Sequence, residues 1–92
     1  MLFADEVEYE RKTDKTCTPY DLMSSTNVND AKKECTANPK CHMFIDYLGD
    51  GRSFGACENT ALIKDSTIIG SALYQKSYGN KISTFEYLSD KL

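Results

Sequence analysis

Residues 31–44 read AKKECTANPKCHMF and decide the fold, because they contain the end of a predicted helix and the start of a predicted strand, each with a cysteine. Asn27 is placed to cap this helix, and Asp30 follows in the first turn in an arrangement like a capping box. Asn38-Pro39 ends the helix, since the residue before proline avoids helical angles and asparagine tolerates a left-handed conformation. The sequence therefore predicts a helix that begins after Asn27 and ends at Asn38-Pro39.

The predicted helix has a narrow apolar stripe. Val28, Ala31 and Cys35 fall on one helical face, whereas residues 32–34 are charged and lie mostly off it. We therefore expect the helix to pack against the rest of the chain with one side only.

A hairpin is predicted directly after the helix. Residues 41–48 form the most apolar stretch of the chain and are rich in aromatic and branched side chains. Gly49-Asp50-Gly51 is a turn signal, and residues 53–57 resume a strand pattern. Asp50 lies between two glycines, where forming the turn is its expected role.

Strand patterns also occur on the N-terminal side of the helix. Residues 6–11 alternate polar with apolar side chains, which places Val7 and Tyr9 on one side of a half-buried strand. Residues 16–23 contain Pro19, which indicates a strand end or an edge position.

The C-terminal third predicts two further strands and a loop. We expect residues 64–71 to be a polar loop, residues 72–76 a strand, and residues 82–88 a last strand beside the N-terminal one. With about five strands and one helix, the predicted fold class is α+β, an antiparallel sheet with one helix packed on a face. Residues 1–92 contain no repeat or linker pattern, so we expect one domain.

Cysteine content indicates the compartment. The chain has 92 residues and four cysteines, an even number that is typical of a disulfide framework in a small secreted domain. The sequence itself leaves all three pairings open. No signal-peptide pattern is present at residues 1–6, and we expect the chain to begin after a removed leader. A cytosolic chain with four free thiols is the alternative.

The order and spacing of several motifs resemble the PAN/apple domain family over residues 17–76. The motifs are Ala31 followed by Cys35, the run Cys41-His42-Met43-Phe44, the later Cys57, and the closing segment 70–76. In the fuller family pattern the helix carries two cysteines four residues apart, whereas here Ala31 occupies the first position. The resemblance then implies disulfides between Cys35 and Cys41 and between Cys17 and Cys57.

The resemblance also implies a function. PAN/apple domains bind proteins, as in clotting and plasminogen-related factors, or carbohydrates, as in galactose-binding lectins of parasite surfaces. We therefore expect a secreted, extracellular recognition or adhesion module that binds a protein partner, with carbohydrate binding as the alternative. Such a module would need no cofactor and would be no enzyme, and it would work within a longer multidomain or multivalent assembly.

Composition and spacing argue against several other chemistries. The net charge of −3 leaves no broad positive field for nucleic acid, and no segment is apolar enough to insert into a membrane. His42 is the single histidine, and its spacing from the cysteines is unlike that of a structural zinc site. Asp46 and Asp50 lack the regular oxygen ligands of a calcium loop, and a small domain offers little room for a closed catalytic cleft.

Candidate ligand-binding residues lie near the predicted hairpin and the closing strand. Tyrosine offers an apolar face with a polar tip, and charged side chains bond to hydroxyl groups or to a partner. The candidates are His42, Asp46, Tyr47, Asp50, Arg52, Lys76 and Tyr78. In the alternative interpretation His42 is a solvent-facing strand residue, and half or more of the six tyrosines pack in the sheet, with Tyr9 and Tyr74 as the expected core members. Protein binding further predicts an exposed apolar patch on the sheet face opposite the helix or along the hairpin.

Overall fold

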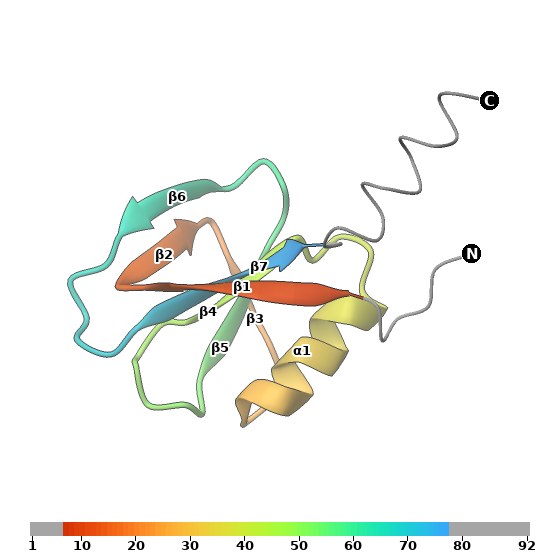
Figure 1. Cartoon of the computed structure of the whole chain (residues 1–92), viewed down its shortest axis with the longest axis horizontal. Helices are drawn as coiled ribbons and strands as arrows, with labels where there is room; N and C mark the ends of the chain where they lie inside the picture. The colour runs from red at the N-terminus through yellow and green to blue at the C-terminus, as the bar shows by residue number, and fades with distance from the viewer. Residues whose placement is uncertain (1–6, 78–92) are drawn as a thin grey trace.

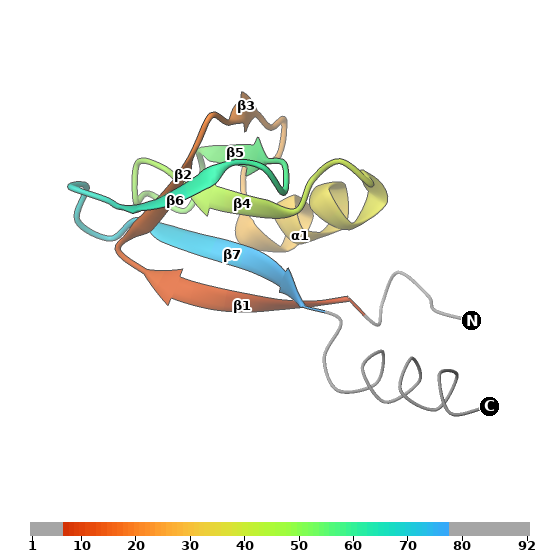
Figure 2. The same cartoon turned by 90° about the horizontal axis from the view of Figure 1, so that it is seen from above.

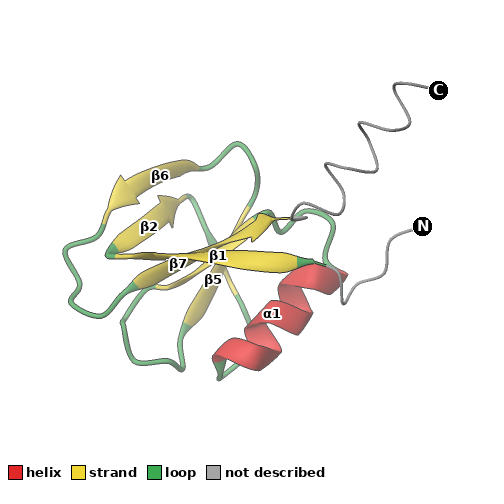
Figure 3. Cartoon of the chain, in the orientation of Figure 1, coloured by secondary structure: helices red, strands yellow, loops and turns green. Residues whose placement is uncertain are grey.

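This computed structural model describes residues 7–77 of the chain. They contain seven strands and one helix, joined by loops and turns (Figure 3). In chain order the elements are β1 (Glu8–Thr13), β2 (Lys15–Thr18), β3 (Asp21–Leu22), α1 (Val28–Ala37), β4 (Met43–Asp46), β5 (Phe54–Cys57), β6 (Leu62–Asp65) and β7 (Ala72–Ser77).

The main sheet has five strands in the order β1-β7-β4-β5-β3, and every neighbouring pair is antiparallel (Figures 1 and 2). Strand β7, the last strand of the described residues, lies between β1 and β4. It therefore connects the first strand of the chain to the central strand of the sheet. The prediction of an α+β fold with a five-stranded antiparallel sheet and one helix is confirmed. The predicted strand at residues 82–88 lies outside the described residues.

A second, two-stranded sheet of β2 and β6 packs beside the main sheet, on the side away from α1 (Figure 2). The sequence did not predict this layer. Residues 16–23 are divided at Pro19 between β2 and β3, which belong to different sheets. Strand β6 takes up the start of the predicted loop, and all four of its residues are exposed, so it carries no alternating pattern. Strands β2 and β6 cover the face of the main sheet opposite the helix, and Leu62 and Ile63 of β6 are themselves exposed. The apolar patch expected on that face or along the hairpin stays a prediction.

The ends of α1 follow from local side-chain chemistry. The side-chain oxygen of Asn27 accepts a hydrogen bond of 2.9 Å from the backbone N–H of Asp30, and its amide donates to the Asp30 carboxylate at 3.0 Å. The predicted cap is confirmed. Asn38 ends the helix in an extended conformation, with φ −105°, rather than the left-handed one considered from the sequence. The following proline accounts for this, since it excludes helical angles at the residue before it.

Two apolar cores lie on the two faces of the main sheet. Because side chains alternate along a strand, Met43 and Ile45 face β2 and β6, whereas Phe44 faces the helix. Phe44 is fully buried and contacts the rings of Phe54, Tyr9 and Tyr74. The two tyrosines expected in the core are half-buried and pack against this helix-side core.

Two disulfides connect the layers. Cys35 of α1 is bonded to Cys41, two residues before β4, with Cα atoms 5.2 Å apart. Cys17 of β2 is bonded to Cys57 of β5, with Cα atoms 6.5 Å apart. These are the two pairs that the resemblance implies. All four cysteines are buried, so the bridges lie inside the two cores. The helix of residues 7–77 is too short to cross a lipid bilayer.

Candidate functional site

The predicted ligand residues are separated into two groups at opposite ends of β4. His42 lies just before β4, and its backbone carbonyl accepts a 3.0 Å hydrogen bond from the backbone N–H of Lys76. Asp46 ends the same strand, and Asp50 and Arg52 follow in the loop to β5. Four residues of extended strand span roughly 13 Å. The fold thus does not bring the candidates into one site, and Tyr78 lies outside the described residues.

The carboxylate of Asp46 holds the β4–β5 loop. Asp46 is buried, with 7% of its surface exposed, and its oxygens accept backbone N–H bonds from Asp50 at 3.2 Å and from Gly51 at 2.9 Å. Gly51 has a φ of +70°, a left-handed conformation that glycine adopts without strain. Asp46 therefore fixes the path of the loop from inside the protein.

Asp50 organises the same loop from its outer side. Its carboxylate accepts bonds from the backbone N–H of Arg52 at 2.8 Å and of Ser53 at 3.0 Å, and from the Ser53 hydroxyl at 3.2 Å. These bonds, led by the one from Arg52, hold the pKa of the Asp50 carboxyl below its usual value. These bonds are those of the turn-forming residue that Asp50 was expected to be. Arg52 lies in an exposed part of the same loop.

Lys76 and His42 occupy the other end of β4. The Lys76 ammonium donates to the Asn38 carbonyl at 3.2 Å, and partial burial lowers its pKa. His42 is half-buried. The contact of Lys76 ties the end of β7 to the residue that ends α1, so this lysine connects two elements of the fold.

Tyr47 takes part in an aromatic pair that the sequence did not predict. Its ring stacks on that of Tyr20, with centroids 5.1 Å apart and planes inclined by 21°. Tyr20 lies over Gly55 of β5, where a Cβ atom would come within 2.6 Å of the tyrosine ring. The glycine thus provides the space for this pair, which joins the β4–β5 loop to the chain segment between β2 and β3.

Three exposed aliphatic side chains lie on two loops whose backbones meet. Leu48 in the β4–β5 loop and Ile68 and Ile69 in the β6–β7 loop are exposed by 53%, 43% and 94%. The two loops lie side by side at one end of the sheet (Figure 1). They touch through their backbones, since a Cβ atom on Gly49 would lie 2.5 Å from the Ile69 carbonyl oxygen. We call these three side chains the loop surface.

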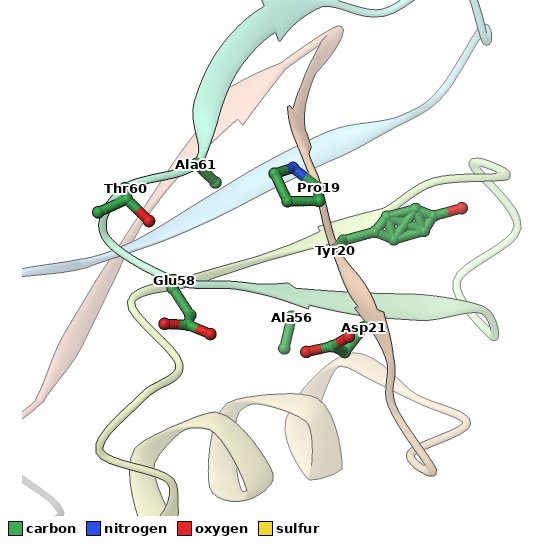
Figure 4. Close-up of a pocket in the computed structure, with 7 residues that line it drawn as sticks. All are labelled: Pro19, Tyr20, Asp21, Ala56, Glu58, Thr60 and Ala61. Carbon is green, nitrogen blue, oxygen red and sulfur yellow. The ribbon is translucent and has the colours of Figure 1, made fainter.

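A shallow pocket lies beside β3, at the opposite edge of the main sheet from β1 (Figure 4). Its volume is about 110 Å³, and its lining residues are Pro19, Tyr20, Asp21, Ala56, Glu58, Thr60 and Ala61. They come from the β2–β3 connection, β3, β5 and the β5–β6 loop. None of them was among the predicted site residues, and no local motif marks a pocket whose walls come from separate segments.

Metal binding finds no support within residues 7–77, where no three histidine, cysteine, aspartate or glutamate side chains are grouped to hold an ion. Comparison of the chain with protein-family models, curated proteins and solved structures finds no match. The PAN/apple resemblance therefore depends on the sequence motifs described above.

Proposed function

We propose that this chain is an extracellular recognition module that binds a protein partner through the loop surface of Leu48, Ile68 and Ile69. The observation that carries the proposal is the 94% exposure of Ile69, which follows Ile68 in a loop whose backbone meets the loop that carries Leu48. A single exposed aliphatic side chain is ordinary, whereas several on two joined loops are typical of an interaction site. Burial of such side chains against a partner is favourable because it removes apolar area from water.

The loops that carry this surface are held in place before any partner arrives. The Asp46 carboxylate fixes the β4–β5 loop, and the Gly49 backbone lies against the β6–β7 loop. Gly70, with φ +87°, turns the chain directly after Ile69. A surface that is already ordered loses less conformational entropy on binding, which favours its use in recognition.

Pocket size also supports a macromolecular ligand. Sites for small molecules have volumes of about 300–1,000 Å³. The pocket beside β3 has about 110 Å³ and the hollow next to it about 70 Å³, so neither encloses a ligand of ordinary size. We therefore propose a non-catalytic role.

The extracellular location is proposed from the sulfur chemistry. Disulfides persist in oxidising compartments and are rare in the cytosol. Two buried bridges in a domain of this size are typical of secreted modules. The resemblance to PAN/apple domains supports both the location and the recognition role.

Carbohydrate binding at the predicted residues has less geometric support. The candidates lie at two ends of β4, and the Asp46 and Asp50 carboxylates already accept bonds from their own loop. A sugar site needs polar groups that converge on one ring. We therefore favour a protein partner.

In the test, the oxidised chain is prepared in multivalent form and applied as a probe to an array of purified extracellular proteins and to a glycan array. We expect binding to at least one array protein, and Ile69→Asp and Leu48→Asp should each weaken it by roughly tenfold or more, as for central interface side chains. Leu62→Asp is the matched control, because Leu62 is also an exposed aliphatic, at 64%, but lies on β6.

Binding to no protein on the array would overturn the proposal, and so would two other outcomes. One is binding to glycans without binding to any protein, which would establish the carbohydrate alternative. The other is protein binding that Ile69→Asp and Leu62→Asp weaken equally, or that neither changes.

A further inference from the structure

The pocket beside β3 has an apolar end and an acidic end. Pro19 and Ala61 form apolar walls, and Ala56 forms a small apolar part of the lining. Figure 4 shows the carboxylates of Asp21 and Glu58 on either side of the Ala56 side chain. A ligand that fits this lining has an apolar stem and a positively charged end.

The two carboxylates, of Asp21 and Glu58, have no hydrogen-bonded or ion-paired partner in the described part of the chain. Lys40 lines the adjoining hollow together with both carboxylates, and it forms an ion pair with neither. A cation that enters the pocket is attracted by both unpaired carboxylates.

The size of the pocket selects the ligand. A volume of about 110 Å³ is too small for a whole small-molecule ligand and fits the end of one side chain. The net charge of −3 adds long-range attraction for a basic partner. Carboxylates pair well with ammonium groups, and with guanidinium groups through paired hydrogen bonds.

We propose that this pocket receives one lysine or arginine side chain of the protein partner, with its methylene stem against Pro19 and Ala61 and its charged end between Asp21 and Glu58. This inference deepens the proposed function, since it depends on the partner being a protein. The pocket and the loop surface are connected through the stacked pair of Tyr20 and Tyr47, so one partner can reach both.

The test needs no knowledge of the partner. The ¹⁵N-labelled, oxidised chain is titrated with Nα-acetyl-lysine N-methylamide and with its arginine counterpart, and amide shifts are followed by NMR. The norleucine analogue is the matched probe, because it keeps the stem and lacks the charge. We expect saturable shifts at Asp21, Ala56, Glu58 and Thr60 with at least one cationic probe, and none with norleucine.

Charge variants distinguish binding of a cation in this pocket from its general electrostatic attraction to an acidic protein. The double variant Asp21→Asn/Glu58→Gln should weaken binding of the cationic probe by roughly tenfold. The matched control Glu8→Gln/Glu10→Gln removes the same net charge from β1, and we expect little change. Lys40→Ala should strengthen binding by roughly two- to threefold, because it removes a competing cation. Dispersed amide spectra of all variants confirm that they are folded.

Several results would overturn the assignment. These are shifts spread over the acidic surface, equal shifts with norleucine, no shifts at all, or shifts at the same amides with a methyl glycoside in place of the cations. If the cationic probes fail while the array still shows protein binding that Ile69→Asp abolishes, the pocket inference is wrong and the proposed function stands. If the cationic probes bind the pocket while the array shows no protein binding, the pocket is a cation site and the protein partner proposed for it is wrong.

Discussion

Substitutions at Gly49 and Gly51 together test the backbone contact between the two loops that carry the loop surface. Both lie in the β4–β5 loop with almost the same backbone angle, φ +69° and +70°. An alanine in this left-handed region costs about 1–2 kcal/mol. At Gly51 nothing lies within 4 Å of the added Cβ, whereas at Gly49 the Cβ meets the backbone of residues 69–71 at 2.5–3.0 Å. The pair therefore separates backbone strain from loop packing.

We expect Gly49→Ala to destabilise the chain by about 1–3 kcal/mol more than Gly51→Ala, the range found when well-packed regions are overfilled. In a domain of this size, 1 kcal/mol lowers Tm by about 4–8 °C. Urea and thermal unfolding of the oxidised proteins measure both quantities, followed by tyrosine fluorescence because the chain has six tyrosines and no tryptophan. Equal losses of stability in the two variants would refute the loop contact, and with it the argument that Ile69 is presented on an ordered loop.

Three further predictions concern the core, a bridge and a carboxylate. Phe44→Ala should cost about 3–5 kcal/mol in unfolding free energy, because a fully buried ring is lost from between its aromatic neighbours; unchanged urea unfolding would contradict the helix-side core. Replacing Cys17 and Cys57 together by alanine should lower the free energy of unfolding by about 4 kcal/mol, whereas removing the Cys35–Cys41 bridge should lower it by about 2 kcal/mol. The reason is loop length, since the bridged residues are 40 and 6 positions apart. A larger loss for the Cys35–Cys41 bridge in denaturant unfolding would exclude this explanation. The Ser25 hydroxyl leads the bonds that lower the pKa of Glu34 below 4.5, so this contribution to stability is present above pH 4.5 and is lost as the pH falls through the lowered folded-state pKa. Glu34→Gln and Ser25→Ala should both flatten the acid side of a Tm-against-pH curve, and an unchanged slope would show that the carboxylate does not hold the segment before α1.

The sequence predicted the elements whose signals are local. The cap at Asn27, the apolar stripe of Ala31 and Cys35, and the stop before Pro39 describe α1 as it occurs. The hairpin of β4 and β5 follows from an apolar run, a glycine-rich turn and a second strand pattern. Each signal involves residues within a few positions of one another, so the backbone preferences and alternation of side chains suffice to predict them.

The candidate site was predicted less well, because function depends on which segments meet. The seven candidate residues were chosen near the hairpin and the closing strand, and β4 holds the described ones apart at its two ends. An apolar patch along the hairpin was expected, but the part played by Ile68 and Ile69 was missed, because the loop that carries them meets the hairpin loop only through a backbone contact. The pocket was missed because Asp21 and Glu58 are brought together by pairing of β3 with β5.

By itself the sequence determined the α+β class, the one-sided helix and the antiparallel hairpin, because helix caps, periodicity and turn residues act within one stretch of chain. Only the tertiary structure decided that residues on the two sides of Pro19 join different sheets, that β6 covers the face opposite α1, and where the loop surface and the pocket form. These features depend on pairing between strands far apart in the chain and on close backbone contacts, which the pattern of side chains along a single segment does not specify.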